Sequence, residues 1–308
     1  MLAKLMRKKS TMIFCVLFCC SLWAISTPIV KIGYNYVDDS HVPSLLLWAG
    51  VQFIVAGIIT IGIYSIFTKK LLLPKKESFK GIAVVSLLQT VLQYSFLYIG
   101  LSQTTAVKGA ILKCTDVFFV ALIASLIFKM EKLTLKKLFC CGIGFIGIIV
   151  MNLDGLTLKI SLMGDGLVVA GVLAYSFSVV ITNLVAQKEN SMMLCGYQMS
   201  FGGVILLIIG ILFKGRLDIM GMLPVLGGLS LIYAVAYNLW TVLLKYHSPS
   251  TVTVYSFMSP ILGVIFSSLI LSEDSGVSNI NLIIALGLVC AGIILWDYQK
   301  KPKVKAKK

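Results

Sequence analysis

The sequence has 308 residues, of which 58% are hydrophobic and only 13% are charged. Soluble domains carry about 25% charged residues, so this composition excludes an ordinary soluble protein. With a mean hydropathy of +0.98, it indicates an integral membrane protein. The formal net charge of +15 would suggest a nucleic-acid partner if it covered a soluble surface. Here the basic residues lie between apolar stretches, where they set membrane orientation, so we expect no nucleic-acid partner.

Ten apolar stretches follow one another along the chain, most of them about as long as a helix that crosses a hydrocarbon core about 30 Å thick. They cover residues 11–30, 44–67, 80–101, 106–128, 137–152, 165–186, 192–213, 222–244, 250–271 and 280–297. No period-2 alternation occurs in them, so we predict helices and not barrel strands. The first stretch also resembles a secretory signal, but it lacks a clear cleavage site and nine further stretches follow it. We therefore interpret it as the first membrane helix.

Basic residues mark one side of the predicted membrane. They gather in the N-terminal segment, in the loops after the second and fourth apolar stretches, and in the tail KKPKVKAKK. The opposite loops hold few of them, so the positive-inside rule predicts that both termini are cytoplasmic. We expect a multi-pass protein of the plasma (inner) membrane whose basic tail faces lipid headgroups.

Several sequence patterns recur at offsets of 142 to 146 residues. The recurring positions are Gly50, Gln52 and Gly57 against Gly196, Gln198 and Gly203, then Gly142 and Gly147 against Gly287 and Gly292, and Glu131 against Glu273. The chain is therefore predicted to contain a cytoplasmic segment at 1–10, five-helix repeats at 11–152 and 165–297, and a basic tail at 298–308. Because five is odd, the second repeat must enter the membrane from the opposite face. This gives the inverted repeat of many secondary transporters.

Two charged residues, Lys113 and Asp116, lie near the middle of the fourth apolar stretch. At 1.5 Å per residue, Asp116 lies roughly 15 Å below the start of that stretch, close to the bilayer centre. Each charge costs at least about 3 kcal/mol there, so both should face a partner or a cavity. Their i, i+3 spacing places them close enough to pair. They are either a self-neutralising ion pair or a cavity-lining pair that binds an anionic substrate group and an amine or proton.

Polar and aromatic side chains form stripes on other predicted helices, at helical spacing. We expect these stripes to bound a central cavity between the first, third, fourth, sixth, eighth and ninth helices. Each stripe can equally serve hydrogen bonds between helices, worth about 0.6 kcal/mol apiece, or pack in the core. Trp48 and Trp296, near helix ends, are expected at the membrane interface instead. With Lys113 and Asp116, the candidate substrate-binding or coupling residues are Trp23, Gln52, Gln89, Gln93, Tyr175, Tyr237, Asn238 and Tyr255.

Three segments carry a family resemblance, namely SLWAIS (21–26), SQTTAVKGAIL (102–112) and SPSTVTVYSFMSPILGVIFSSLILSED (248–274). With the GxxxxG helices and the ten-helix plan, they make the chain similar to the EamA-type members of the drug/metabolite transporter superfamily. The resemblance implies an all-α membrane protein of ten transmembrane helices, arranged as two inverted five-helix repeats. It also implies a central substrate cavity, with the fifth and tenth helices at the periphery. Gln52 and Phe118 stand where the family often has Arg and Pro, so the resemblance does not extend to the substrate.

Enzyme activity is not expected. His41 and His247 lie in loops on opposite sides, and no HExxH, GxSxG or phosphate-binding glycine loop occurs. The eight cysteines lie inside predicted helices, without the spacing of a metal site or a disulfide framework, so no cofactor is expected. We predict gradient-driven export of small organic metabolites, such as amino acids, by alternating access. The open alternatives are a drug or nucleotide-conjugate carrier and a non-transporting scaffold, and the chain can act alone or as a homodimer.

Overall fold

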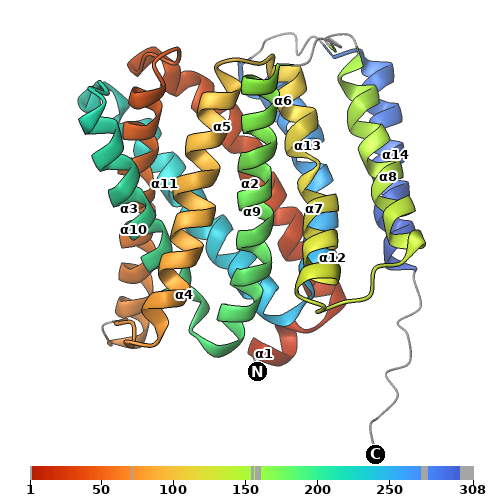
Figure 1. The fold of residues 1–308 in the computed structure, drawn as a ribbon, viewed down its shortest axis with the longest axis horizontal. Helices are drawn as coiled ribbons and strands as arrows, with labels where there is room; N and C mark the ends of the chain where they lie inside the picture. Colours follow the sequence, from red (N-terminus) through yellow and green to blue (C-terminus); the bar gives the residue numbers. More distant parts are fainter. Residues whose placement is uncertain (1, 71, 154–155, 157–160, 272–276, 299–308) are drawn as a thin grey trace, which may run out of the picture.

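The computed structural model describes residues 2–70, 72–153, 156, 161–271 and 277–298, and these residues form helices and no strand. Most helices run along one common direction, as the ribbon in Figure 1 shows. The first half contains α1 (Leu2–Met6), α2 (Lys9–Gly33), η1 (Tyr34–Tyr36), α3 (Val42–Thr68), α4 (Ser78–Val85), η2 (Ser86–Leu92), α5 (Gln93–Leu101), α6 (Ala106–Lys113), α7 (Asp116–Leu122), η3 (Ile123–Ile127) and α8 (Leu135–Met151). The second half contains α9 (Leu162–Lys188), α10 (Ser191–Leu212), α11 (Ile219–Tyr246), α12 (Pro249–Thr253), η5 (Val254–Phe257), α13 (Met258–Leu271) and α14 (Asn279–Asp297).

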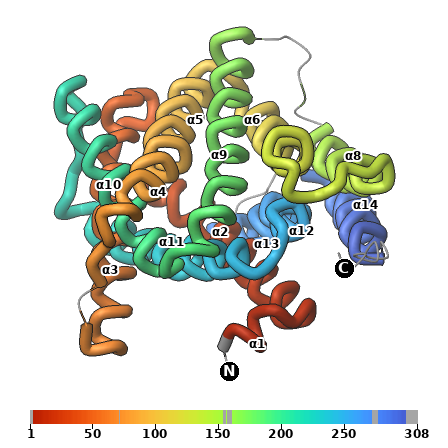
Figure 2. Tube along the Cα trace, turned by 60° about the horizontal axis from the view of Figure 1, so that its bottom comes forward, coloured from red at the N-terminus to blue at the C-terminus, as the bar shows by residue number. Residues whose placement is uncertain are grey.

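Nine helices or continuous helical runs of the described chain, 19 to 28 residues long, are long and apolar enough to cross a membrane. The remaining apolar stretch is α8, whose 17 residues lie alongside α14. The prediction of an all-helical membrane protein is therefore confirmed, while ten crossings stay a prediction. Figures 1 and 2 both show α8 and α14 set to one side of the other helices, where the family resemblance placed the fifth and tenth helices.

The repeated glycines pack against one another with the symmetry of an inverted repeat. A Cβ atom on Gly50 would lie 2.9 Å from the carbonyl oxygen of Gly203, and one on Gly57 would lie 2.6 Å from that of Gly196. Since Gly50 corresponds to Gly196 and Gly57 to Gly203, the contact between α3 and α10 maps onto itself when the halves are exchanged. This relation confirms the inverted repeat.

The pair formed by α8 and α14 obeys the same relation. A Cβ atom on Gly147 would lie 3.0 Å from the Ala285 carbonyl oxygen, and one on Gly292 would lie 2.7 Å from that of Cys140. At an offset of 145 residues, Gly147 corresponds to Gly292 and Cys140 to Ala285. Glycine is needed at both crossings because any side chain would meet the backbone of the facing helix.

Gly50→Ala should lower the free energy of unfolding by about 1–3 kcal/mol, the usual cost of overpacking. The added methyl group would stand 2.5 Å from the Leu207 backbone nitrogen, which cannot move aside as a side chain can. Gly62→Ala in the same helix is the control, since no atom lies within 4 Å of the position that its added methyl group would occupy. Unfolding of the detergent-solubilised variants, followed by circular dichroism, should separate the two. Equal stability would contradict the tight crossing.

Both ends of the described chain lie at the same end of the bundle (Figure 1). Lys9 Nζ at the start of α2 lies 3.2 Å from Asp297 Oδ1 at the end of α14. We call this the basic end, because the lysine-rich loops after α3 and η3 lie there, and we call the opposite end the distal end. Asp154, Lys159, Glu273, Asp274 and the tail 299–308 lie outside the described residues.

Trp48 and Trp296 do not face outward as belt side chains at a membrane interface do, because these residues are only 3% and 5% exposed, and their depth in the membrane stays a prediction. The Trp48 indole packs over Gly33, where a Cβ atom would lie 2.5 Å from its ring. The Trp296 ring lies beneath Lys137 Nζ, 5.3 Å from the ring centre. Contacts with Gly33 and Lys137 of neighbouring segments thus help to bury the two indoles.

The remaining helices pack as two groups that each combine both halves of the chain. The first group consists of α4–η2–α5, α6–α7–η3 and α9, and the second group consists of α11, α12–η5–α13 and α2. Lys108 Nζ of α6 lies 2.6 Å from Asp165 Oδ2 of α9, so an ion pair joins members of the first group at the distal end. Exchanging the two halves converts one group into the other. The close pair of α3 and α10 contacts α11 and η2 beside them.

Candidate functional site

An aromatic cluster lies where α2, α3, α5 and α11 meet. The Trp23 ring centre is 5.6 Å from that of Tyr237 and 4.9 Å from that of Trp240. Phe53 contacts Tyr94 at 4.8 Å, and the hydroxyl groups of Tyr94 and Tyr237 are 3.1 Å apart. The structure thus brings together the predicted residues Trp23 and Tyr237. Phe53 and Tyr94 are not among the residues that the sequence indicates, although Tyr94 directly follows the candidate Gln93.

Several buried polar atoms around this cluster have no hydrogen-bond partner within the described chain. They include the indole nitrogens of Trp23 and Trp240, Gln93 Oε1 and Asn238 Oδ1. A buried polar group left without a partner costs about 1–3 kcal/mol, so such groups are uncommon unless they serve a ligand, water or ion. Two donors and two acceptors thus lie unpaired beside aromatic rings, a combination that is typical of sites for small organic molecules with polar groups.

Other candidates make hydrogen bonds between helices. Asn238 Nδ2 donates to Thr60 Oγ1 at 2.7 Å, which joins α11 to α3. Gln198 Oε1 accepts from Thr90 Oγ1 at 2.9 Å, and the backbone oxygen of Gln52 accepts from Ser230 Oγ at 3.1 Å. Gln89 is 6% exposed on η2. None of these residues faces outward, and the polar stripes serve helix packing at least in part.

Lys113 and Asp116 do not form the direct ion pair that their spacing suggested, since no ion pair joins them in the described chain. The helix is interrupted between them. The backbone nitrogens of Cys114 and Thr115 donate to the oxygens three residues back, at 3.1 Å each, so α6 ends at Lys113 and α7 begins at Asp116. Lys113 is exposed, whereas Asp116 is only 8% exposed. The i, i+3 rule assumes a continuous helix, and this turn breaks it.

Asp116 lies at a junction of helices from both halves. Its carboxylate interacts with the Ser256 hydroxyl of η5 and, at longer range, with Lys113. It also interacts electrostatically with Cys20 of α2 and Tyr175 of α9. Tyr175 is also within electrostatic range of Tyr94 of the aromatic cluster.

The ninth apolar stretch is interrupted like the fourth. The 3-10 segment η5 separates α12 from α13, near the position that corresponds to the turn at Cys114 and Thr115. Pro260 is the third residue of α13, where its missing N–H costs no helical hydrogen bond. Interrupted membrane helices at corresponding places in two halves are typical of the binding region of secondary transporters.

Tyr255 lies apart from the aromatic cluster. Its hydroxyl donates to Asp297 Oδ2 at 2.6 Å, beside the ion pair of Asp297 with Lys9. This hydrogen bond joins η5 to the end of α14 at the basic end. A contact between helices therefore accounts for the Tyr255 hydroxyl.

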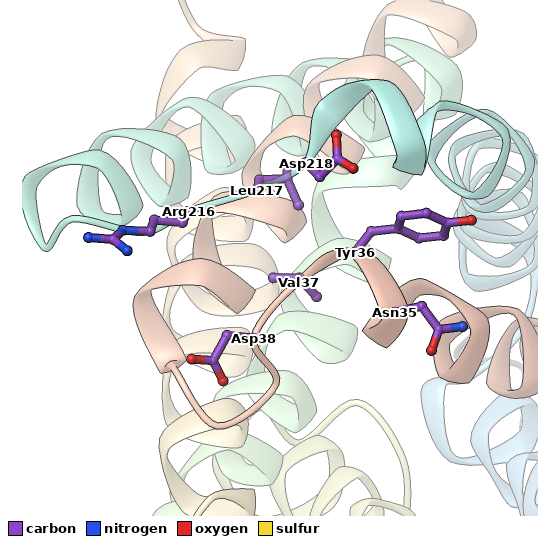
Figure 3. A pocket seen from close by; sticks show the side chains of 7 residues that line it. All are labelled: Asn35, Tyr36, Val37, Asp38, Arg216, Leu217 and Asp218. Carbon is purple, nitrogen blue, oxygen red and sulfur yellow. The ribbon is translucent and has the colours of Figure 1, made fainter.

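A depression of about 610 Å³ opens at the distal end between η1 and the loop before α11. It is lined by residues 35–38 and 216–218. Figure 3 shows that the Asp38 and Arg216 side chains do not point toward each other. The hydroxyl and backbone N–H of Ser40 hold the pKa of Asp38 below its usual value. The depression contains none of the residues predicted for the site, and the predicted central cavity stays a prediction.

Comparison with known proteins connects this architecture to membrane transport. Residues 10–153 and 162–296 match the EamA-like transporter family. The uncharacterized transporter YvbV of Bacillus subtilis is 24% identical over 292 residues, which cover 92% of this chain and 91% of that protein. An uncharacterized transporter of Methanothermobacter thermautotrophicus is 26% identical over 216 residues, covering 67% of this chain and 63% of that protein. A crystal structure matches with a TM-score of 0.75 and 15% identity over 94% of this chain and 97% of that chain, which shows the fold alone.

Proposed function

Because the chain belongs to the EamA-like transporter family, we propose that it exports small organic metabolites, amino acids or related compounds, by gradient-driven alternating access. The observation that carries this proposal is Asp116. It is a buried carboxylate at a helix interruption in the middle of a membrane-spanning run, without a cation at ion-pair distance in the described chain. Ionisable groups at such depths mark substrate or proton pathways because they are costly to keep there.

Lys113 supplies the complementary charge. It is the last residue of α6, and only the turn at Cys114 and Thr115 separates it from α7, which contains Val117 and Val120. Both valines are 0% exposed, and α7 packs against α12. Lys113 itself is exposed, and α6 and α13 are not among the closely packed helix pairs of the described chain. A lysine in lipid at this depth would cost about 3 kcal/mol, so we propose that its ammonium group faces the predicted central cavity between the two groups of helices.

A zwitterionic solute fits these two charges. The Lys113 ammonium would bind its carboxylate, Asp116 would bind its amine or exchange a proton with it, and the aromatic cluster would contact its apolar part. The unpaired donors and acceptors of Trp23, Gln93 and Asn238 would bind its remaining polar groups. This combination supports amino acids and their relatives over purely apolar compounds.

The basic end is assigned to the cytoplasm. The lysine-rich loops after α3 and η3 lie there together with both ends of the described chain. Basic loops are retained on the cytoplasmic side of the plasma membrane. Export would then carry the solute from the basic end to the distal end.

Transport assays on proteoliposomes are expected to identify the solute class. Purified protein, reconstituted with an imposed proton or sodium gradient, should accelerate the movement of at least one amino acid or related zwitterion tenfold or more over empty liposomes. Uncharged sugars serve as the control. Movement of hydrophobic drugs or nucleotide conjugates instead would assign the alternative carrier functions. A protein that moves no solute and co-purifies stoichiometrically with a partner would overturn the proposal in favour of a scaffold.

A further inference from the structure

We infer that the structure is the state closed at the basic end, and that Glu131 is the latch that holds this closure by binding α12 from the loop after η3. The inference rests on the proposed alternating access and names the residue that controls it. Four observations lead to it: where the two groups of helices touch, where their symmetry-related contacts are weaker, what Glu131 binds, and how deeply α12 is buried.

Direct contacts between the two groups concentrate at the basic end. The inner parts of the two interrupted runs meet there, with α7 packed against α12. Asn183 of α9 donates to the backbone oxygens of Leu244 and His247, the latter at 2.9 Å. Lys245 Nζ donates to the backbone oxygen of Glu189 at 2.7 Å. Both sets of hydrogen bonds join α9 of the first group to the end of α11 in the second.

The corresponding contacts at the distal end of the described chain are weaker. Exchange of the two halves converts the α7–α12 contact into one between α13 and α6, and the α9–α11 contact into one between α2 and α5. Neither of these helix pairs is among the closely packed pairs of the described chain, whereas α7–α12 and α9–α11 are. Two halves with one fold thus adopt unequal arrangements, as expected when a transporter is closed at one end. The paired hydroxyls of Tyr94 and Tyr237 bridge the groups deeper in the bundle.

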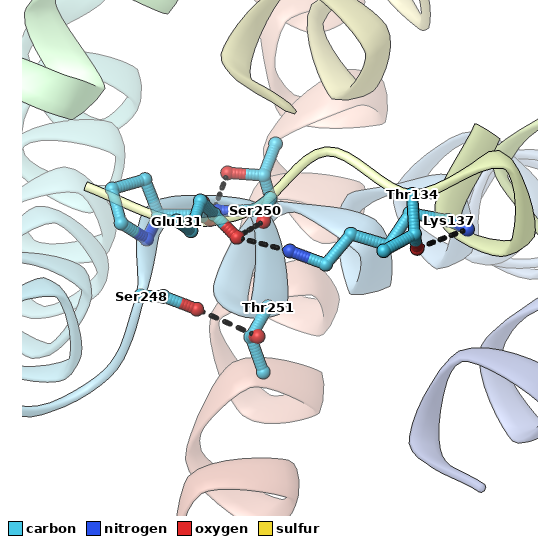
Figure 4. A network of polar contacts seen from close by, with 8 residues as sticks. Glu131, Thr134, Lys137, Ser248, Ser250 and Thr251 are labelled. Carbon is cyan, nitrogen blue, oxygen red and sulfur yellow. Dashed lines mark hydrogen bonds and ion pairs between the residues drawn. The ribbon is translucent and has the colours of Figure 1, made fainter. Parts of the chain in front are cut away.

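Glu131 makes charge-assisted polar contacts between the interrupted runs. Its carboxylate accepts from the Ser250 backbone nitrogen at 3.3 Å and from the Ser250 hydroxyl, and it lies 2.5 Å from Lys137 Nζ of α8. Figure 4 shows these three interactions converging on one carboxylate. The Glu131 side chain is only 9% exposed, so water screens the network little.

The place of these contacts distinguishes a latch from a permanent brace. A brace would join helices of one group, as the Lys108–Asp165 ion pair does at the distal end. Glu131 instead joins the first group to α12 of the second group, so the two groups cannot separate at the basic end until its bonds to Ser250 break. Charge-assisted hydrogen bonds are strong enough to set such an equilibrium. We therefore expect Glu131 to determine how often the basic end opens.

Thr253→Cys provides a reporter for this opening. Thr253 is the last residue of α12 and is 0% exposed, so a cysteine there is shielded while the latch is closed. The full chain is placed in lipid nanodiscs, where both faces meet solvent, and treated with a membrane-impermeant maleimide. Labelling of the native cysteines is subtracted using the chain without the reporter. Glu131→Ala should raise the rate of reporter labelling about tenfold, which corresponds to about 1.4 kcal/mol of lost closed-state stability.

Two further variants keep the experiment decisive. Ser250→Ala removes one hydroxyl and should raise labelling about threefold, even if Glu131→Ala fails to fold. Glu77→Ala removes an exposed carboxylate just before α4 at the same end and should change nothing. Unchanged labelling in folded Glu131→Ala, or in Ser250→Ala when the first variant does not fold, overturns the latch. So does an equal increase in Glu77→Ala. Since labelling requires no solute, the latch is tested separately from the proposed transport activity.

Discussion

Asp116→Asn is expected to reduce transport of the identified solute about a hundredfold and to leave the protein folded. Asparagine keeps the shape of the side chain beside Ser256, but it carries no negative charge. Hydrogen bonds to charged groups contribute about 1.5–3 kcal/mol. The upper part of this range corresponds to about a hundredfold in rate. Initial rates in proteoliposomes with equal amounts of protein measure the effect.

The missing ion pair makes this single substitution informative. If Lys113 were bound directly to Asp116, removing either partner would leave a buried charge unpaired and damage the protein whatever its role. Lys113 is exposed instead, so Asp116→Asn should retain the parental unfolding temperature. Asp38→Asn, on the exposed distal loop, is the control for loss of a carboxylate. Normal transport by Asp116→Asn, or by a folded Lys113→Met and Asp116→Leu double variant across a range of pH, would remove these residues from the mechanism.

The inverted repeat could be predicted from the sequence because tight helix crossings require glycine. Gly50 and Gly57 recur as Gly196 and Gly203, and the structure places each glycine against the facing backbone. A backbone crossing leaves no room for an alternative residue type at these positions. The repeated glycines therefore indicate where two helices cross. Apolar residues do not, because in a membrane helix they face lipid and protein alike.

The interruption after Lys113 could not be predicted in the same way. The turn contains Cys114 and Thr115, with neither glycine nor proline, and the surrounding residues read as one continuous apolar helix. Local bonds stabilise it, including one from Thr115 Oγ1 to the Leu112 oxygen at 2.6 Å. Such bonds compete with helical ones but have no specific sequence signature. The expected ion pair is absent for this reason.

The polar stripes show a second limit of the sequence. Helical spacing indicates Gln93 and Asn238, but it identifies only a buried face and not the partner of each atom. In the structure the two polar atoms of the Asn238 amide have different roles. Nδ2 donates a hydrogen bond to Thr60, whereas Oδ1 has no partner in the described chain. One side chain can thus serve both packing and ligand binding, so the two interpretations of a stripe are compatible.

Trp23→Phe should raise the KM for the solute about tenfold and change stability little. Phenylalanine keeps an aromatic ring beside Tyr237 and Trp240, and the exchange removes an indole N–H that has no partner in the described chain. Folding therefore loses no hydrogen bond. A bound solute would lose one worth about 0.5–1.5 kcal/mol, which is close to tenfold in affinity at the upper limit. Transport rates across solute concentrations, and thermal unfolding, measure both effects.

Trp48→Phe is the matched control, because its indole N–H is likewise buried without a partner in the described chain but lies in the distal cluster with Leu45 and Met222. This exchange opens space in a packed core where the indole is 3% exposed, so it should lower the unfolding temperature and leave KM unchanged. Trp23→Phe should therefore change KM and not stability, whereas Trp48→Phe should change stability and not KM. A Trp23→Phe variant with parental KM would show that the indole only fills space, and that the aromatic cluster is a core instead of a binding surface.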